Sequence, residues 1–145
     1  MSVAKGAAAI GAGAVVIVSG GYGVSTLFKV PYAYSLDDYL KKPDYKSKES
    51  TYTTGKFGNK NKTKLIASFD PDNKDRWNYI YEKILKPLQM ANNASSKLDS
   101  AFQKNQVTVG YSEESGSNAS TALNKICDDA YKVDDPTGTK KSNIW

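Results

Sequence analysis

The residues that could carry out chemistry are a single cysteine, Cys127, and fifteen Asp and Glu residues, in a chain that has no histidine. Without histidine, the chain cannot form the Ser–His or Cys–His pairs that activate a nucleophile, and it lacks the side chain most used for proton transfer near neutral pH. One cysteine forms no intrachain disulfide and holds no structural zinc ion alone. No carboxylate pair lies in an apolar setting, so we predict no enzymatic activity, no catalytic residue and no cofactor.

One acidic motif imitates a calcium site. Asp70 and Asp72 have the spacing of the first two ligands of an EF-hand loop. The position that requires glycine is Asp75, and the position that requires glutamate is Tyr81. An aspartate followed by proline is also typical of a helix start. We therefore interpret Asp70 as a helix cap and predict no metal site.

An uncharged run rich in alanine and glycine extends from Gly6 to Phe28. Its glycines do not form a nucleotide loop, because Val16 stands where a G-x-G-x-x-G motif that begins at Gly11 needs its last glycine. The run is long enough to cross a bilayer, since a spanning helix needs about 20 residues. We therefore predict a transmembrane helix over residues 6–28.

Two other interpretations of this run remain open. Residues 7–18 have the length of the apolar part of a signal peptide, and small residues follow at Ser19 and Gly20, so cleaved export is one alternative. A buried segment of a soluble domain is the other. A bacterial lipoprotein signal is excluded, because no cysteine follows the run.

Two signals in the sequence favour opposite orientations of the predicted anchor. More lysines follow the run than precede it, which by the positive-inside rule favours an internal C-terminal part. An early anchor with a very short N-terminal tail, however, usually leaves its N-terminus inside the cell. We adopt the second orientation, which predicts a single-pass protein of the cell membrane with an extracellular C-terminal domain. Tyr32 and Tyr34 then follow the run at the place where interfacial aromatic rings lie.

The chain divides into three predicted parts, with a mainly α fold. They are a membrane anchor or signal segment over residues 1–30, a linker with a short helix over 31–64, and a small helical domain of about three helices over 65–145. In the linker, Ser35 predicts the N-cap of a helix over 36–41, which ends before Pro43. The rest of the linker is rich in Lys, Ser, Thr, Asn and Gly, and is expected to be disordered or weakly extended around residues 51–57.

The domain's first helix is predicted to begin at Asp70–Pro71, to carry an apolar stripe, and to be kinked or ended by Pro87. The stripe consists of Trp77, Ile80, Tyr81, Ile84 and Leu88. A second helix is expected over residues 88–103, with Leu88, Ala91, Ala94, Leu98 and Phe102 facing inward. A short strand over 107–111 and a third helix over 121–132, capped by Ser120, complete the prediction. The inward side of the third helix consists of Leu123, Ile126, Cys127, Ala130 and Tyr131, which makes Cys127 a small buried hydrophobe.

Three stretches resemble the short paralogous membrane-anchored proteins of hemotropic mycoplasmas. They are the opening MSVAKGAAAIGAGA, the central KLIASFDPDNKDRWNYIYEKI and the later ALNKICDDAYKVDD. The family often has a tryptophan beside the helix cysteine, whereas Ile126 and Asp128 flank Cys127 here. The resemblance implies a membrane-attached, antigenically variable surface protein, and it supplies neither a reaction nor catalytic residues.

Taken together, these features predict a surface or interaction protein without enzymatic activity. Its expected partners are the lipid bilayer, through residues 6–28, and a protein at the cell surface. The alternative is a secreted or membrane-peripheral protein that binds anionic partners through a basic surface, since the formal net charge is +5. Because the lysines are spread through loops and form no block, the sequence argues against a nucleic acid partner.

Overall fold

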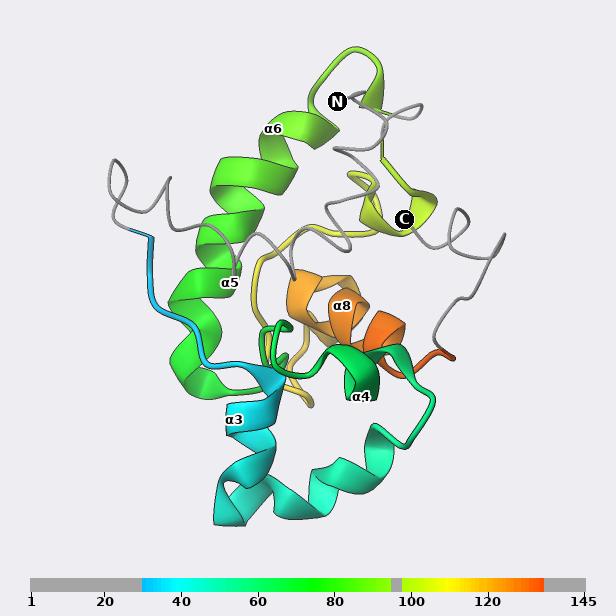
Figure 1. The fold of residues 1–145 in the computed structure, drawn as a ribbon. Coiled ribbons are helices and arrows are strands. Elements are labelled where there is room, and N and C mark those ends of the chain that lie inside the picture. Colours follow the sequence, from blue (N-terminus) through cyan, green and yellow to red (C-terminus); the bar gives the residue numbers. More distant parts are fainter. Residues whose placement is uncertain (1–29, 95–97, 135–145) are drawn as a thin grey trace.

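The computed structural model of the chain describes residues 30–94 and 98–134, and the regular elements within these ranges are all helical (Figure 1). The predicted mainly α fold is therefore confirmed for the described part. The predicted anchor over residues 6–28 lies outside it. No helix in residues 30–94 and 98–134 is long and apolar enough to cross a membrane.

The first helix, α3 (Leu36–Lys41), begins at the predicted cap. The Ser35 hydroxyl accepts a hydrogen bond from the Asp38 amide at 3.1 Å, and the Asp38 carboxylate accepts one from the Ser35 amide at 3.3 Å. This reciprocal arrangement satisfies two amides that the first turn leaves without helical partners. The helix ends before Pro43, as predicted, because Lys42 has an extended backbone.

The expected disordered or weakly extended linker is wrong for residues 43–61, which are largely helical. A 3₁₀ helix, η1 (Pro43–Thr51), follows α3 directly, and a short helix, α4 (Phe57–Asn61), comes after a turn at Gly55. Composition misled here because a few aromatic rings anchor an otherwise polar segment. Tyr52 is 4% exposed, and the ring of Tyr45 stacks on that of Tyr39 with centroids 4.2 Å apart.

A continuous helical column follows, built from η2 (Pro71–Asn73), α5 (Lys74–Ile80), the π-helical turn η3 (Tyr81–Leu85) and α6 (Lys86–Gln89) (Figure 1). The Asp70 side chain accepts a hydrogen bond from the Asp72 amide at 3.1 Å, which confirms the predicted cap. Pro87 does not end the column at once, contrary to one alternative. The π-helical turn lies just before Pro87. In it the Lys86 amide donates a hydrogen bond to the Tyr81 carbonyl, so the hydrogen-bond register of the helix has already changed at the place where Pro87 has no amide to donate.

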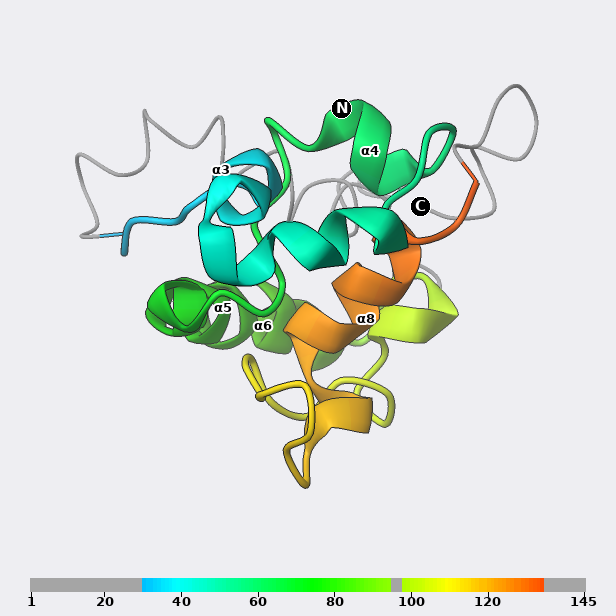
Figure 2. The same ribbon diagram turned by 90° about the horizontal axis from the view of Figure 1, so that it is seen from below.

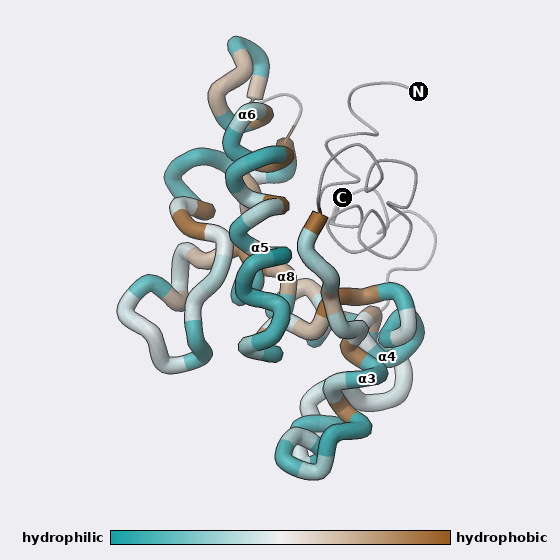
Figure 3. The backbone as a smooth tube through the Cα atoms, turned by 90° about the vertical axis from the view of Figure 1, so that its left-hand side faces the viewer, coloured by the Kyte–Doolittle hydropathy of each residue, from teal (hydrophilic) through white to brown (hydrophobic). Residues whose placement is uncertain are grey.

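The π-helical turn also shifts the buried face by one residue. Trp77, Ile80 and Tyr81 are buried as predicted, but the next buried positions are Leu85 and Gln89. The predicted positions, Ile84 and Leu88, are only partly buried. A π-helical turn holds one more residue than an α-helical turn, so a 3.6-residue period read from the sequence misses the shift. Figure 3 shows apolar segments recurring between polar ones along this column.

The predicted helix over residues 88–103 is wrong for residues 90–93, and residues 95–97 lie outside the described ranges. Helix α6 ends at Gln89, residues 90–93 form turns, and a single 3₁₀ turn, η4 (Ser100–Phe102), begins after Asp99. Asn, Ser and Asp are frequent in this stretch, and their side chains compete for backbone hydrogen bonds, which favours turns and caps. The expected inward residues Leu98 and Phe102 are nevertheless buried, at 4% and 3% exposure.

The last helix, α8 (Leu123–Tyr131), starts two residues later than predicted and has no side-chain cap from Ser120. A loop takes over that role. The Leu123 amide bonds the Val109 carbonyl at 2.9 Å, and the Asn124 amide bonds the Gly110 carbonyl at 3.2 Å. The strand expected over residues 107–111 is absent, because this segment is used to cap α8 and forms only an isolated bridge between Val109 and Ala122.

Helix α8 lies at the centre of the described part. In Figure 2 it has η1 and α4 on one side and the chain from residue 107 to residue 122 on the other. Its inward face carries Leu123, Cys127 and Tyr131, each at most 1% exposed. These side chains belong to one buried cluster with residues of the predicted linker and of the helical column, among them Leu36, Tyr39, Leu40, Tyr52, Leu65, Ile66, Trp77, Ile80 and Leu85.

Candidate functional site

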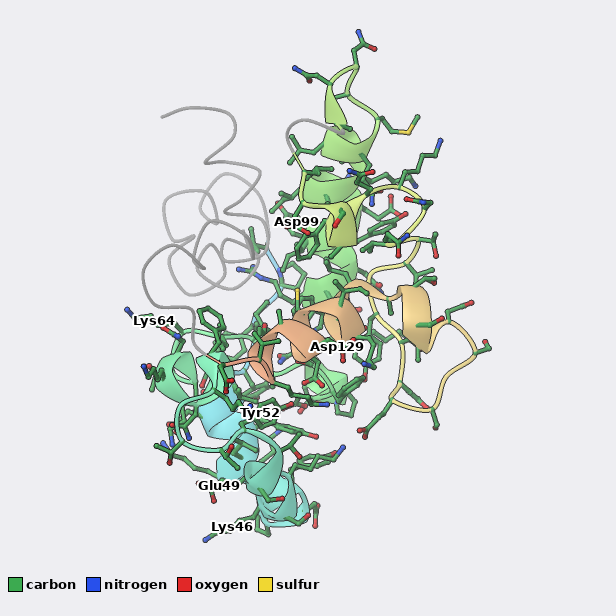
Figure 4. All side chains as sticks on the ribbon, turned by 90° about the vertical axis from the view of Figure 1, so that its right-hand side faces the viewer. Lys46, Glu49, Tyr52, Lys64, Asp99 and Asp129 are labelled. Atoms are coloured by element: carbon green, nitrogen blue, oxygen red, sulfur yellow. The ribbon has the colours of Figure 1, made fainter. Side chains whose placement is uncertain are left out.

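A buried carboxylate, Asp128, is the most enclosed charged group of α8, with no exposed surface. The Tyr52 hydroxyl donates a hydrogen bond to Oδ1, and the Lys132 ammonium lies 2.6 Å from Oδ2. In Figure 4, Tyr52 lies between η1 and α8. Oδ1 therefore has a hydrogen-bond donor, while Oδ2 makes no hydrogen bond among the described residues and is balanced by the charge of Lys132 alone. The arrangement fastens η1 to α8.

Three buried tyrosines surround this region. Burial raises the pKa of Tyr52, Tyr39 and Tyr131, and nearby Asp128 adds to the rise for each of them. Their phenols stay protonated at neutral pH, so Tyr52 serves as a donor to Asp128. The hydroxyls of Tyr39 and Tyr131 have no hydrogen-bond partner among the described residues. None of these three phenols exchanges a proton near pH 7.

Cys127 is the small buried hydrophobe that the sequence predicted. Its side chain is 1% exposed, and burial, followed by the neighbouring Asp128 charge, raises the pKa of the thiol. A nucleophilic cysteine needs the thiolate and access to its substrate. Cys127 has neither in this structure, so it packs the core.

A lysine of the protein pairs with Asp70 and Asp72, the two aspartates whose spacing resembles that of a calcium loop. The Lys42 ammonium lies 2.7 Å from Asp70 Oδ2 and 3.4 Å from Asp72 Oδ2, and Asp70 is fully buried. Burial lowers the pKa of Lys42, but the hydrogen bond and charge of Asp70 outweigh it and leave that pKa raised. Within residues 30–94 and 98–134, no group of three His, Cys, Asp or Glu side chains could hold a metal ion.

Ion pairs between lysines and carboxylates interrupt the basic surface. Lysines throughout the described part lie within ion-pair distance of carboxylates, among them Lys41, Lys42, Lys48, Lys56, Lys62, Lys86, Lys125 and Lys132. Figure 4 places Lys46 and Lys64 at separate corners of the molecule. Exposed pairs of this kind contribute little stability, but they reduce the local positive potential.

The most distinctive exposed feature is a segment without regular structure, residues 31–34, which we call the aromatic segment. Tyr32 is 72% exposed and Tyr34 is 37% exposed, and their rings meet edge to face with centroids 5.1 Å apart. The Tyr34 amide donates to Asn73 Oδ1 at 2.7 Å, and the Tyr34 carbonyl accepts from Asn73 Nδ2 at 2.9 Å. Two aromatic rings therefore face solvent on a backbone that is held in place.

Three buried amide side chains were not anticipated from the sequence. Asn73 holds the aromatic segment, while Asn124 accepts from the Ser112 amide and donates to the carbonyls of Ser68 and Ser112. Gln89 donates to the carbonyls of Phe102 and Val107, at 2.9 and 3.0 Å. Such side chains replace the backbone pairing that strands would give to irregular segments. Their only signal in the sequence is a polar residue at a helix position that proves to face inward.

Comparison with known proteins adds no relative. No model of a protein family matches the chain, and no curated protein or solved structure matches it either. The resemblance to the mycoplasma family therefore stays a prediction.

Proposed function

We propose that the protein is a membrane-anchored surface protein that binds partners and catalyses no reaction. The observation that carries this proposal is the position of the aromatic segment. Tyr32 is exposed and its neighbour Tyr34 is fixed, and the uncharged run ends at Phe28, only four residues before Tyr32. Such an arrangement suits a domain joined directly to a membrane span, where tyrosines favour the interface.

The chemistry of the described side chains supports a binding role. Cys127, Asp70 and Asp128 are the groups that most resemble catalytic residues by type, and each is at most 1% exposed. Asp70 and Asp128 are committed to hydrogen bonds and ion pairs that connect separate segments. A reactive group must reach its substrate, so these three residues serve the fold.

Two measurements on the full chain test this proposal. The first is resistance of the membrane-bound protein to alkaline carbonate extraction, which a transmembrane anchor withstands. The second is protease treatment of intact cells, which should remove an epitope within residues 98–134. Survival of that epitope on intact cells, with cleavage after lysis, would contradict the surface location. Release of the protein by carbonate would contradict the anchor.

One observation favours the second candidate, a peripheral protein that binds anionic partners. Residues 50–69 contain four lysines and no acidic residue, and two of these lysines, Lys56 and Lys62, pair with carboxylates of other segments. Binding through these lysines should weaken steeply as salt is added, because it releases counterions. Absence of binding to anionic vesicles or nucleic acid at low ionic strength would eliminate this candidate.

A further inference from the structure

The aromatic segment is fixed to the helical column at two places. Besides the two bonds between Tyr34 and Asn73, the Tyr34 carbonyl accepts from the Ala67 amide at 3.1 Å. The Pro31 carbonyl accepts from Arg76 Nη1 at 2.9 Å. Asn73 is fully buried, and Arg76 is 7% exposed. The backbone on both sides of Tyr32 is thus bonded to side chains whose own positions are set by packing.

The predicted span ends close to this fixed segment. Phe28 lies four positions before Tyr32, and a fully extended chain advances at most about 3.5 Å per residue, so the two Cα atoms lie within about 14 Å. The polar layer on each side of a bilayer core is about 5–8 Å thick. A span that ends at Phe28 therefore leaves Tyr32 within reach of the headgroups, and it allows little slack for a flexible tether.

We propose that Tyr32 and Tyr34 insert into the headgroup layer and hold the domain in one orientation against the membrane. This inference rests on the proposed anchor and adds the residues and the geometry of contact. Tyrosine has an apolar ring and a polar hydroxyl, which suits the boundary between acyl chains and water. Exposed rings on a fixed backbone lose little conformational entropy when they bind.

The charge around the aromatic segment indicates the kind of lipid. The Lys42 ammonium lies 4.7 Å from the centroid of the Tyr34 ring, but it is paired with Asp70 and Asp72. This side of the domain therefore carries no excess positive charge from Lys42. Insertion of a tyrosine depends on its apolar ring and polar hydroxyl and not on net charge, so we assign the contact to zwitterionic headgroups.

The orientation also predicts which part of the domain is far from the lipid. In Figures 1 and 2, the chain at residues 30–33 lies at one edge of the molecule, and the turn at residues 53–56 lies at the opposite edge. Thr54 is exposed in that turn. A domain held by the aromatic segment keeps Thr54 away from the headgroups, whereas a freely swinging domain brings Thr54 to them part of the time, and position 32 stays near the span in either case.

The experiment places a fluorophore at either site in the full chain. Tyr32→Cys and Thr54→Cys are each labelled and reconstituted into phosphatidylcholine vesicles that contain lipids with a nitroxide on the headgroup. The native Cys127 is 1% exposed and should remain unlabelled, which labelling of the unmodified chain checks. We expect quenching several-fold stronger at position 32 than at position 54. Adding Tyr34→Ser to Tyr32→Cys should reduce that difference, while Tyr34→Phe, which keeps the ring, should preserve most of it.

The outcomes separate this inference from the proposed function. If the chain resists carbonate extraction but Tyr34→Ser leaves the ratio of quenching between positions 32 and 54 unchanged, the tether alone keeps position 32 near the lipid and the inference is wrong, while the anchor stands. If the chain resists extraction and neither position is quenched, the tyrosines do not touch lipid, and the inference fails again. If carbonate releases the chain, the anchor and the inference fail together.

Discussion

The Tyr52 hydroxyl donates a hydrogen bond to the carboxylate of Asp128, 76 positions later in the chain, and both side chains are buried. This contact joins the predicted linker to the last helix. It shows that residues 43–52 belong to the packed structure.

Replacing Tyr52 with phenylalanine should therefore destabilise the protein. The change removes the donor to a buried carboxylate oxygen and keeps the ring, so we expect a loss of about 1–3 kcal/mol in the free energy of unfolding. Tyr131→Phe is the matched control, because its hydroxyl is equally buried but has no hydrogen-bond partner among the described residues. Urea unfolding of both variants measures the difference. Equal losses in the two variants would contradict a specific role for the Tyr52–Asp128 bond.

A second substitution tests the buried amide on α6. Gln89→Leu keeps the approximate volume but leaves the carbonyls of Phe102 and Val107 without a donor. The expected loss in the free energy of unfolding is about 1–3 kcal/mol. Gln106 is exposed and provides the control, since Gln106→Leu should change the stability by less than about 0.5 kcal/mol. If Gln89→Leu proved as mild as Gln106→Leu, Gln89 would not support the 102–107 loop.

Local signals predicted two of the helix starts, although the predicted cap of α8 by Ser120 was wrong. Ser35 and Asp70 cap helices where expected, because a cap depends on residues that lie within one turn of it. The inward positions Leu123, Cys127 and Tyr131 of α8 were also predicted correctly, because that helix keeps a regular period.

Features that depend on distant residues were not predictable in this way. The Tyr34–Asn73 bonds span 39 positions and the Asn124–Ser68 bond spans 56, so nothing near these residues in the sequence announces them. The π-helical turn is a further case, since Leu85 and Gln89 enter the buried face where the period predicts Ile84 and Leu88. The caps of α8 come from the carbonyls of Val109 and Gly110, whose backbone position has no sequence signature.

Gly110 marks a close approach between the loop that caps α8 and the helical column. A Cβ atom at this position would lie 2.6 Å from the Asn78 Cα and 2.8 Å from the Trp77 carbonyl oxygen. Because these are backbone atoms of a helix, they cannot move aside easily, and Gly110→Ala should cost about 3 kcal/mol. Gly55→Ala is the comparison: no atom lies within 4 Å there, but φ is +94°, so we expect about 1–2 kcal/mol. Thermal unfolding ranks the two, and a milder Gly110→Ala would mean that the loop can retreat from α5.

Cys127 should make the protein less stable as the pH rises above neutral. Burial, and then the charge of Asp128, raises the pKa of its thiol in the folded state, whereas in the unfolded chain the thiol has a pKa of about 8.5. Between these values the unfolded chain binds fewer protons, so the free energy of unfolding falls by about 1.4 kcal/mol per pH unit.

Cys127→Ala removes the contribution of the thiol to this pH dependence. The free energy of unfolding should therefore fall less steeply between about pH 8.5 and pH 10 in the variant. Above about pH 10, the buried phenols of Tyr39, Tyr52 and Tyr131 have the same sign of effect, since each pKa is raised above its unfolded value, so both proteins should then lose stability steeply. Urea unfolding across this pH range compares the slopes, which are independent of the cost that the smaller alanine adds at every pH. Parallel curves for the two proteins below pH 10 would show that the thiol ionises as readily in the folded state as in the unfolded chain, and that Cys127 is not enclosed as described.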